Sequence, residues 1–330
     1  MIQVIIMIYI LTRSSTNSCY EKWTDYLQHP FYFVNNFDEN WTAPEDCSII
    51  ITHDTYRPEP CAIIRRSVEH QIPVLILADG ILEYRNSWRQ KHAVKSGVFN
   101  PVLGHKLACI GDSQVRFLES LVGNIGKCES VGLPRLEGLA NETEKKCDSN
   151  LLICSSKTPW FREKDKLQVI EAFRDLKQYK KDIEKVFNVS LLWRVTQDLA
   201  NLIDVESSIS NPLHVDLSRS CAVVTMPSTV MLESMILGLP VAIVDYTSSP
   251  HYVPAAWSIT SKDKIFSIVR ELLTPPKPRL EFQESILKDS LQMTESPSLR
   301  LARLVECMIN ESLQCCLANQ PLAFSKKILS

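Results

Sequence analysis

The sequence predicts an α/β protein built from two doubly wound domains, each with a parallel sheet. Short apolar runs rich in Ile and Val alternate with segments of helical periodicity, a pattern typical of parallel sheets covered on both faces. The alternation stops at the polar, aperiodic residues 138–149 and then starts again. The 330 residues also suffice for two domains of about 150 residues each. We therefore expect an N-terminal domain over residues 1–138 and a C-terminal domain over 139–330, which includes the C-terminal helices, facing each other across a cleft.

The N-terminal run, residues 1–11, is apolar and rich in Ile, without a basic segment. It is shorter than the roughly 20 residues that span a bilayer, so we interpret it as a buried strand. Similar runs predict further strands of the first domain at residues 31–34, 47–52, 72–78, 106–110 and 127–132. Helices are expected at residues 58–70 and 113–122, with Ser113 as the cap of the second.

The second half repeats the alternation without repeating the sequence. Strands are expected at residues 151–154, 189–195, 222–225 and 241–244. Helices are expected at residues 166–186, 214–220, 228–237 and 262–273, and the remainder, about 280–317, also has a helical pattern. The helix over 166–186 carries many charges, which indicates a solvated face.

Composition excludes several classes of protein. The net charge of -2 gives no basic field for nucleic acid. Glycine occurs only 9 times, and neither G-x-G-x-x-G nor G-x-x-x-x-G-K-[ST] is present, so a bound nucleotide would lack a glycine-rich cradle. The 11 cysteines form no C-x-x-C pair, which indicates a reducing, cytoplasmic location. No His, Cys, Asp or Glu cluster has metal-ligand spacing and D-x-D is absent, so we expect neither a metal nor another cofactor.

The most informative segment is residues 222–245, which have the pattern strand, turn, helix, tight stop, strand. Ser228 and Thr229 occupy the position of a helix N-cap, where free backbone N–H groups and hydroxyls can bind an anion. Glu233 follows one turn later on the same helix face as Thr229, surrounded by apolar residues. Gly238 stands where the helix is expected to end.

This segment, P-S-T-V-M-L-E-S-M-I-L-G-L-P-V, resembles the donor-site motif of GT-B glycosyltransferases, [ST]-x-x-x-E-x-x-x-x-G-x-P. It is similar also to related enzymes of bacterial surface polysaccharide synthesis. The resemblance implies two Rossmann-like domains, with a nucleotide-sugar held by the C-terminal one. It implies that Ser228 and Thr229 bind the diphosphate and that Glu233 binds the ribose.

Three further residues are candidates for the same ligand. Lys157 and Arg194 follow or end predicted strands of the second domain, at the sheet edge where ligands of open α/β folds bind. Either could neutralise a departing diphosphate, a task that the resemblance assigns to protein cations or helix dipoles in place of a metal. His251 lies in the loop after the next strand, at the same edge.

Transfer to an acceptor hydroxyl requires a base, and the first domain offers two candidates. Asp79 is the first choice, because it follows a strongly apolar strand and the next residue, Gly80, lets a substrate approach the backbone. His53, at the end of another predicted strand, is the second choice. A cap of the following helix is an alternative role for Asp79.

The predicted function is therefore glycosyl transfer from a nucleotide-diphosphate sugar to a saccharide or lipid-linked acceptor, in surface polysaccharide synthesis. Peripheral association with a membrane is compatible with a lipid-linked acceptor. Two alternatives stay open: a nucleotide-sugar epimerase of the same fold, which needs no acceptor, and a non-catalytic protein that binds sugar nucleotides.

Overall fold

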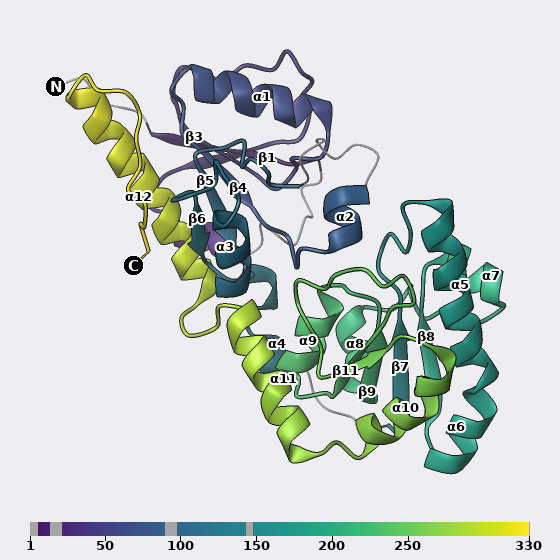
Figure 1. The fold of residues 1–330 in the computed structure, drawn as a ribbon. Coiled ribbons are helices and arrows are strands. Elements are labelled where there is room, and N and C mark those ends of the chain that lie inside the picture. Colours follow the sequence, from purple (N-terminus) through teal and green to yellow (C-terminus); the bar gives the residue numbers. More distant parts are fainter. Residues whose placement is uncertain (1–5, 14–21, 90–97, 143–147, 330) are drawn as a thin grey trace. The chain divides into compact units, whose positions relative to one another are not determined.

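The computed structural model describes residues 6–13, 22–89, 98–142 and 148–329. These residues form two compact units (Figure 1). Unit 1 contains Met1–Gly80, His92–Glu137 and Ser290–Ser330, and unit 2 contains Ile81–Lys91 and Gly138–Asp289. The division differs from the expected one at residue 138 in two respects. The C-terminal segment belongs to unit 1, and a short segment of the first half, Ile81–Lys91, belongs to unit 2.

Unit 1 is built on a parallel sheet with the strand order β2-β1-β3-β4-β5-β6. The strands are β1 (Met7–Leu11), β2 (Phe31–Val34), β3 (Cys47–Thr52), β4 (Val74–Leu77), β5 (Lys106–Cys109) and β6 (Cys128–Ser130). The helices are η2 (Trp23–Tyr26), α1 (Pro58–Glu69), α3 (Asp112–Glu119), η3 (Pro134–Leu136) and α12 (Pro297–Leu317). All six strands lie within or overlap the expected ranges, although residues 1–5 of the first lie outside the described part.

The apolar runs are continuous because both faces of this sheet are buried. Ile49 and Ile51 of β3 pack with residues of α12, whereas Ile50 between them packs with residues of α1. Figure 1 shows α12, in yellow, lying beside the strands of the first half of the chain. The pattern of charged and apolar C-terminal residues predicted a helix. The structure shows that this helix, α12, covers one face of the sheet of unit 1.

Two glycines permit the C-terminal segment to approach this sheet. A Cβ on Gly111 would lie 2.4 Å from the backbone of Ser290, and one on Gly132 would lie 2.6 Å from the carbonyl oxygen of Gln292. Gly132 also has a φ of +100°. Gly111 is the N-cap of α3, so the expectation that Ser113 caps this helix is wrong: Ser113 lies inside α3, one residue after its first residue.

Unit 2 is built on a parallel sheet with the order β11-β10-β9-β7-β8. The strands are β7 (Asn150–Cys154), β8 (Ser190–Arg194), β9 (Ser220–Thr225), β10 (Val241–Val244) and β11 (Trp257–Ile259). The helices are α2 (Tyr84–Arg89), α4 (Leu139–Glu142), α5 (Glu163–Gln178), α6 (Lys180–Phe187), α7 (Gln197–Ile203), α8 (Leu213–Ser218), α9 (Val230–Ile236), η4 (Lys262–Lys264), α10 (Ile265–Leu273) and α11 (Lys277–Ser290).

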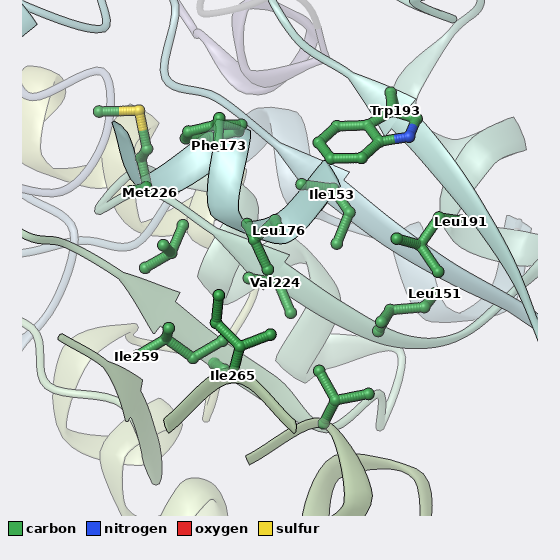
Figure 2. Packing of buried hydrophobic residues seen from close by; sticks show 14 of the residues in the cluster. Leu151, Ile153, Phe173, Leu176, Leu191, Trp193, Val224, Met226, Ile259 and Ile265 are labelled. Atoms are coloured by element: carbon green, nitrogen blue, oxygen red, sulfur yellow. The ribbon is translucent and has the colours of Figure 1, made fainter. Parts of the chain in front are cut away.

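The core of unit 2 lies between this sheet and the helices that follow its strands (Figure 2). Phe173 and Leu176 of α5 pack with Ile153 and Val224 of the central strands, and all four are almost fully buried. The helix expected over residues 166–186 is two helices, which meet at Tyr179, where a ψ of -4° ends α5. The helix α7 and the strand β11 were not expected.

No helix in the described parts of the chain is both long and apolar enough to cross a membrane.

Candidate functional site

The two sheets share one strand order, and that order predicts where a ligand binds. In each sheet, the first strand along the chain lies between the second and the third. The second strand is therefore added on one side of the first strand, and the third strand is added on its other side. In open α/β sheets, ligands bind beyond the carboxyl ends of the strands at this switch point. The switch point lies between β7 and β9 in unit 2, and between β1 and β3 in unit 1.

At the switch point of unit 2, short loops bring small polar side chains together. The N–H of Met226 donates to the carbonyl of Cys154 at 3.1 Å, so the chain after β9 continues beside the end of β7. The hydroxyls of Thr225 and Ser228 lie 3.4 Å apart. Lys157 is exposed three residues beyond β7, and no hydrogen bond or ion pair joins its side chain to the rest of the described chain. Ser228 and Lys157 therefore lie at the ends of neighbouring strands, as expected.

Helix α9 begins at this edge, immediately after Thr229. The expectation that a hydroxyl caps the helix is wrong for Thr229, since no cap hydrogen bond forms and its backbone is already helical, with φ -61° and ψ -20°. Its hydroxyl instead accepts a hydrogen bond from the N–H of Ile81 at 3.3 Å. A hydroxyl that accepts one bond still has a proton to donate.

Glu233 lies in the first turns of α9 and is 8% exposed. The helix ends at Ile236, and Gly238, which was expected to terminate it, lies five residues after Glu233 with a φ of +69°. The N–H groups of Gly238 and Leu239 donate to the carbonyls of Met235 and Ser234, at 2.9 and 3.0 Å, which is the Schellman arrangement. The carboxylate is thus held on a short helix that is fixed at its far end.

Arg194, the last residue of β8, has a structural role in unit 2. Its Nη1 donates to the carboxylate of Asp216 at 2.9 Å and to the carbonyls of Ser208 and Asn211 at 3.2 and 2.8 Å. Asp216 is fully buried and also accepts from the Ser208 hydroxyl. These contacts tie the loop after α7 to the sheet, so the charge of Arg194 is largely balanced by Asp216.

His251 lies in the loop after β10 and is oriented by a residue that sequence reasoning missed. Its Nε2 is 3.0 Å from a carboxylate oxygen of Asp245, which is 5% exposed and directly follows β10. Burial opposes the ionisation of Asp245, but hydrogen bonds from His251 and Thr247 outweigh it and hold the pKa of the carboxyl below its usual value. Asp245 could have been identified from the sequence, because it is an acidic residue directly after an apolar run.

Residues 81–89, the described part of the segment Ile81–Lys91, pack against this loop within unit 2. The Trp88 Nε1 donates to the Tyr252 hydroxyl at 2.7 Å, and the ring of Tyr84 lies 6.4 Å from that of Tyr252. Residues of the segment and of the loop line a crevice that leaves no room for a water molecule. A stretch of the first half of the sequence is thus part of the unit that carries the Glu233 motif.

Three charged side chains of this segment are occupied by contacts inside unit 2. Arg85 is 1% exposed and pairs with Glu83, and its Nη1 lies 3.5 Å from the carbonyl of Pro159. Burial raises the pKa of Glu83, and the negative charge of Asp245 raises it further. Arg89 pairs with Asp165 at 2.9 Å. The segment therefore buries an ion pair next to the Asp245–His251 pair.

The two candidate bases lie in unit 1, at the ends of adjacent strands. His53 follows β3, at the switch point of that sheet, and Asp79 follows β4 and is exposed. At this edge, burial raises the pKa of the Tyr56 phenol, and the charges of Asp79 and Asp54 raise it further. Gln114 of α3 donates to the carbonyl of Gly80 at 3.3 Å, which holds the turn after Asp79.

In the parts of the chain that the structure describes, no group of three or more His, Cys, Asp or Glu side chains is placed to hold a metal ion.

No family model matches this chain, and no curated protein matches it. Several solved structures do. The wall teichoic acid polymerase TagF superposes with a TM-score of 0.59 and 13% identity, over 94% of this chain and 90% of that chain. The UDP-GlcNAc 2-epimerase of Methanocaldococcus jannaschii, in complex with UDP-GlcNAc and UDP, gives 0.59 and 11%, over 91% and 99%. The S. aureus MnaA–UDP co-structure gives 0.56 and 13%, over 97% and 99%.

At these identities the likeness concerns the fold. It extends over nearly the whole length of each chain, and it includes both a polymerase and an epimerase. The alternation of strands and helices in the sequence, together with the motif in residues 228–240, predicted the same fold. The protein therefore has the fold of the GT-B superfamily, with two units that each carry a parallel, doubly wound sheet.

Proposed function

We propose that the protein is a glycosyltransferase that moves a sugar from a nucleotide-diphosphate sugar to a saccharide or lipid-linked acceptor. The observation that carries the proposal is the buried carboxylate of Glu233, one turn into α9, beside the switch point where Ser228 and Lys157 lie. Hydroxyls and an exposed ammonium suit a diphosphate, and a fixed carboxylate suits the vicinal hydroxyls of a ribose. The GT-B fold is compatible with this ligand.

In the transfer step, the bond between the anomeric carbon and the diphosphate oxygen breaks while the acceptor oxygen forms a new bond to that carbon. Negative charge develops on the departing diphosphate. Lys157, the hydroxyls of Ser228 and Thr229, and the backbone N–H groups that begin α9 are the groups we assign to stabilise it. Arg194 has its own partner in Asp216 and is a secondary candidate.

The acceptor hydroxyl loses its proton to a base of unit 1 in an inverting reaction. Asp79 is an exposed carboxylate at the end of β4, and His53 lies at the switch point of the same sheet. We expect Asp79→Asn and His53→Asn to leave donor binding unchanged, and the variant that removes the base to lower turnover by about 100-fold or more. A protein that retains full turnover in both variants would rule out both residues.

Polymer synthesis is the context we propose, since TagF is a wall teichoic acid polymerase by name. A cytoplasmic location fits the reduced state of the cysteines in the described residues.

The donor site is tested by thermal denaturation with UDP-, GDP-, CDP- and ADP-linked sugars. A ligand at 100 times its Kd stabilises the folded state by about 2.7 kcal/mol, which corresponds to a rise in Tm of several degrees. We expect one nucleotide class to give this rise with the natural protein and with Glu163→Ala, a control on the exposed side of α5. We expect Glu233→Ala to lose it. Absence of any rise with all four classes would overturn the donor site.

The Asp245–His251 pair favours a second candidate function, an epimerase that acts on the nucleotide-sugar alone. The pair lies at the end of β10, beside the strand that leads to Ser228. A carboxylate-oriented imidazole could take the proton from the sugar carbon beside the anomeric carbon while the bond to the diphosphate breaks, and a second acid would protonate the other face while that bond forms again. Incubation with the bound nucleotide-sugar in D₂O, without acceptor, distinguishes the two: epimerisation replaces a C–H signal in the proton NMR spectrum, whereas transfer leaves the sugar unchanged.

A further inference from the structure

A row of aromatic rings, of which Tyr32 is exposed and Tyr9 and Trp41 are half-buried, lies on one face of the sheet of unit 1, at its edge strand. Tyr9 of β1 and Tyr32 of β2 are register partners on adjacent strands, and their ring centroids are 6.1 Å apart. The ring of Trp41, from the loop after β2, lies 6.3 Å from that of Tyr9. Tyr32 is 61% exposed, although the residue is large and apolar over most of its surface. We name these three rings the aromatic platform.

Two adjoining pockets open over the aromatic platform. One, of about 510 Å³, is lined by the three rings together with Asn35 and Asn36. The other, of about 860 Å³, shares Asn35, Asn36 and Trp41 and continues past the carboxyl ends of β1 and β2. Their volumes lie in the range of small-molecule sites, about 300–1,000 Å³. No hydrogen bond joins either asparagine side chain to other described residues.

The aromatic platform is held in place before any ligand arrives. The hydroxyl of Tyr9 donates to Asp46 at 2.9 Å, and burial together with this carboxylate raises the pKa of Tyr9 to about 12. Arg66 of α1 donates to the carbonyls of Glu39 and Trp41, which fixes the loop after β2 to a helix. Ordered aromatic faces and a fixed loop lower the entropic cost of binding.

We propose that the aromatic platform and its asparagines bind a neutral saccharide chain. The C–H faces of sugar rings pack on aromatic rings, and carboxamides both donate to and accept from sugar hydroxyls. Charge in the pockets argues against nucleic acid, which requires unpaired cations along the backbone. Arg13, which lines the larger pocket, pairs with Glu59 at 3.2 Å, and Asp38 contributes a negative charge to the same pocket.

The place of the aromatic platform in the fold connects it with the proposed function. The larger pocket includes Arg13 and Asn35, which follow the carboxyl ends of β1 and β2. His53 follows β3, the next strand, at the same edge of the sheet. The identification of the bound saccharide as the acceptor rests on the proposed glycosyl transfer, whereas the binding itself does not.

The test is saccharide binding to the full chain, with chitohexaose, cellohexaose and maltohexaose as probes in calorimetric titration and saturation-transfer NMR. We expect at least one hexasaccharide to bind, and Tyr32→Ala to weaken it by about 10-fold or more. Phe31→Ala is the matched control, because Phe31 is a neighbouring aromatic residue, 38% exposed, on the opposite face of β2. Its variant is expected to bind as the natural protein does.

Three results would overturn the proposal: absence of binding by all three hexasaccharides, equal weakening by Tyr32→Ala and Phe31→Ala, or tighter binding of a deoxythymidine oligonucleotide at the same residues. No nucleotide-sugar is present in this titration. A failure of the donor site, read from Glu233→Ala, is therefore distinguishable from a failure of the aromatic platform.

Discussion

The two units have sheets of the same strand order, yet their switch points carry different chemistry. In unit 2, hydroxyls and a lysine follow the strands, and a buried carboxylate lies one helical turn beyond. In unit 1, Arg13, His53 and Asp54 follow the corresponding strands β1 and β3. Topology therefore fixes the edge at which a ligand binds, and the residue types there decide which part of a reaction each sheet can serve.

The units differ also in which segment a buried ion pair connects to the sheet. In unit 1, Lys106 of β5 binds Glu129 of β6 at 2.8 Å, and the same ammonium donates to the carbonyls of Ser325 and Lys326 in the C-terminal tail. In unit 2, the Arg194–Asp216 pair binds a loop that is close in sequence. The Lys106–Glu129 pair thus connects the sheet to residues far away in the sequence, whereas the Arg194–Asp216 pair connects it to a nearby loop.

The largest expected effect comes from removing the ammonium of unit 1. Lys106→Met leaves Glu129 as a charge that is only 2% exposed, which costs about 3–5 kcal/mol. We expect Arg194→Met to cost less, because the side chain of Arg194 is 17% exposed against 1% for Lys106, so water can take its place beside Asp216. Hydrogen–deuterium exchange in urea, read from peptides of each unit, measures the two losses separately. A smaller loss in unit 1 than in unit 2 would contradict this ranking.

A smaller difference is expected between two glycines with left-handed backbones. Gly238→Ala in unit 2 strains a φ of +69°, at a cost of about 1–2 kcal/mol. Gly132→Ala in unit 1 adds to its strain a collision with the carbonyl of Gln292, so the C-terminal segment must also shift. Thermal denaturation should show a larger fall in Tm for Gly132→Ala. Equal falls would mean that the segment moves away without cost.

A third difference between the units is their acid sensitivity. Burial, with the charge of Lys127 nearby, lowers the pKa of His105 in unit 1 from 6.5 to about 4, and its Nδ1 accepts from the N–H of Val74. The unfolded chain binds the proton first, so unit 1 loses stability as the pH falls from about 6.5 to about 4. Asp245 of unit 2, whose pKa is held below 3.8, adds a loss only below that window.

Urea denaturation at pH 7, 5.5 and 4.5, followed by exchange in each unit, checks this window. His105→Gln keeps an acceptor for Val74 but does not titrate, so its unit 1 should lose less stability over the same range. An unchanged pH dependence in this variant would show that other groups are responsible.

Sequence patterns predicted the strands well where an apolar run is bounded by polar residues on both sides. The ranges 31–34, 47–52 and 241–244 agree with β2, β3 and β10 to the residue. The strand β11 was missed, since it has only three residues and lies in a stretch without alternation. The helix end at Gly238 was predicted because only glycine adopts a positive φ at low cost there.

Long-range contacts account for what the sequence could not supply. Helical periodicity shows that residues 297–317 bury one face, but it does not identify the sheet that receives it. Nothing in the local sequence of residues 81–89 shows that Arg89 pairs with Asp165, 76 residues further along the chain. Asp245 was passed over because its partner, His251, becomes apparent only when the loop after β10 is folded.

The position of α12 has a consequence for synthesis of the protein on the ribosome. The strands of unit 1 are complete at residue 130, but the helix that covers one face of their sheet begins at residue 297. At a translation rate of about 5–20 residues per second, that apolar face of the nascent sheet stays uncovered for roughly 10–30 s. A premature stop codon after residue 289 would leave every segment of unit 2 translated and unit 1 permanently open. Such a chain would depend on chaperones in a way that the full-length protein does only briefly.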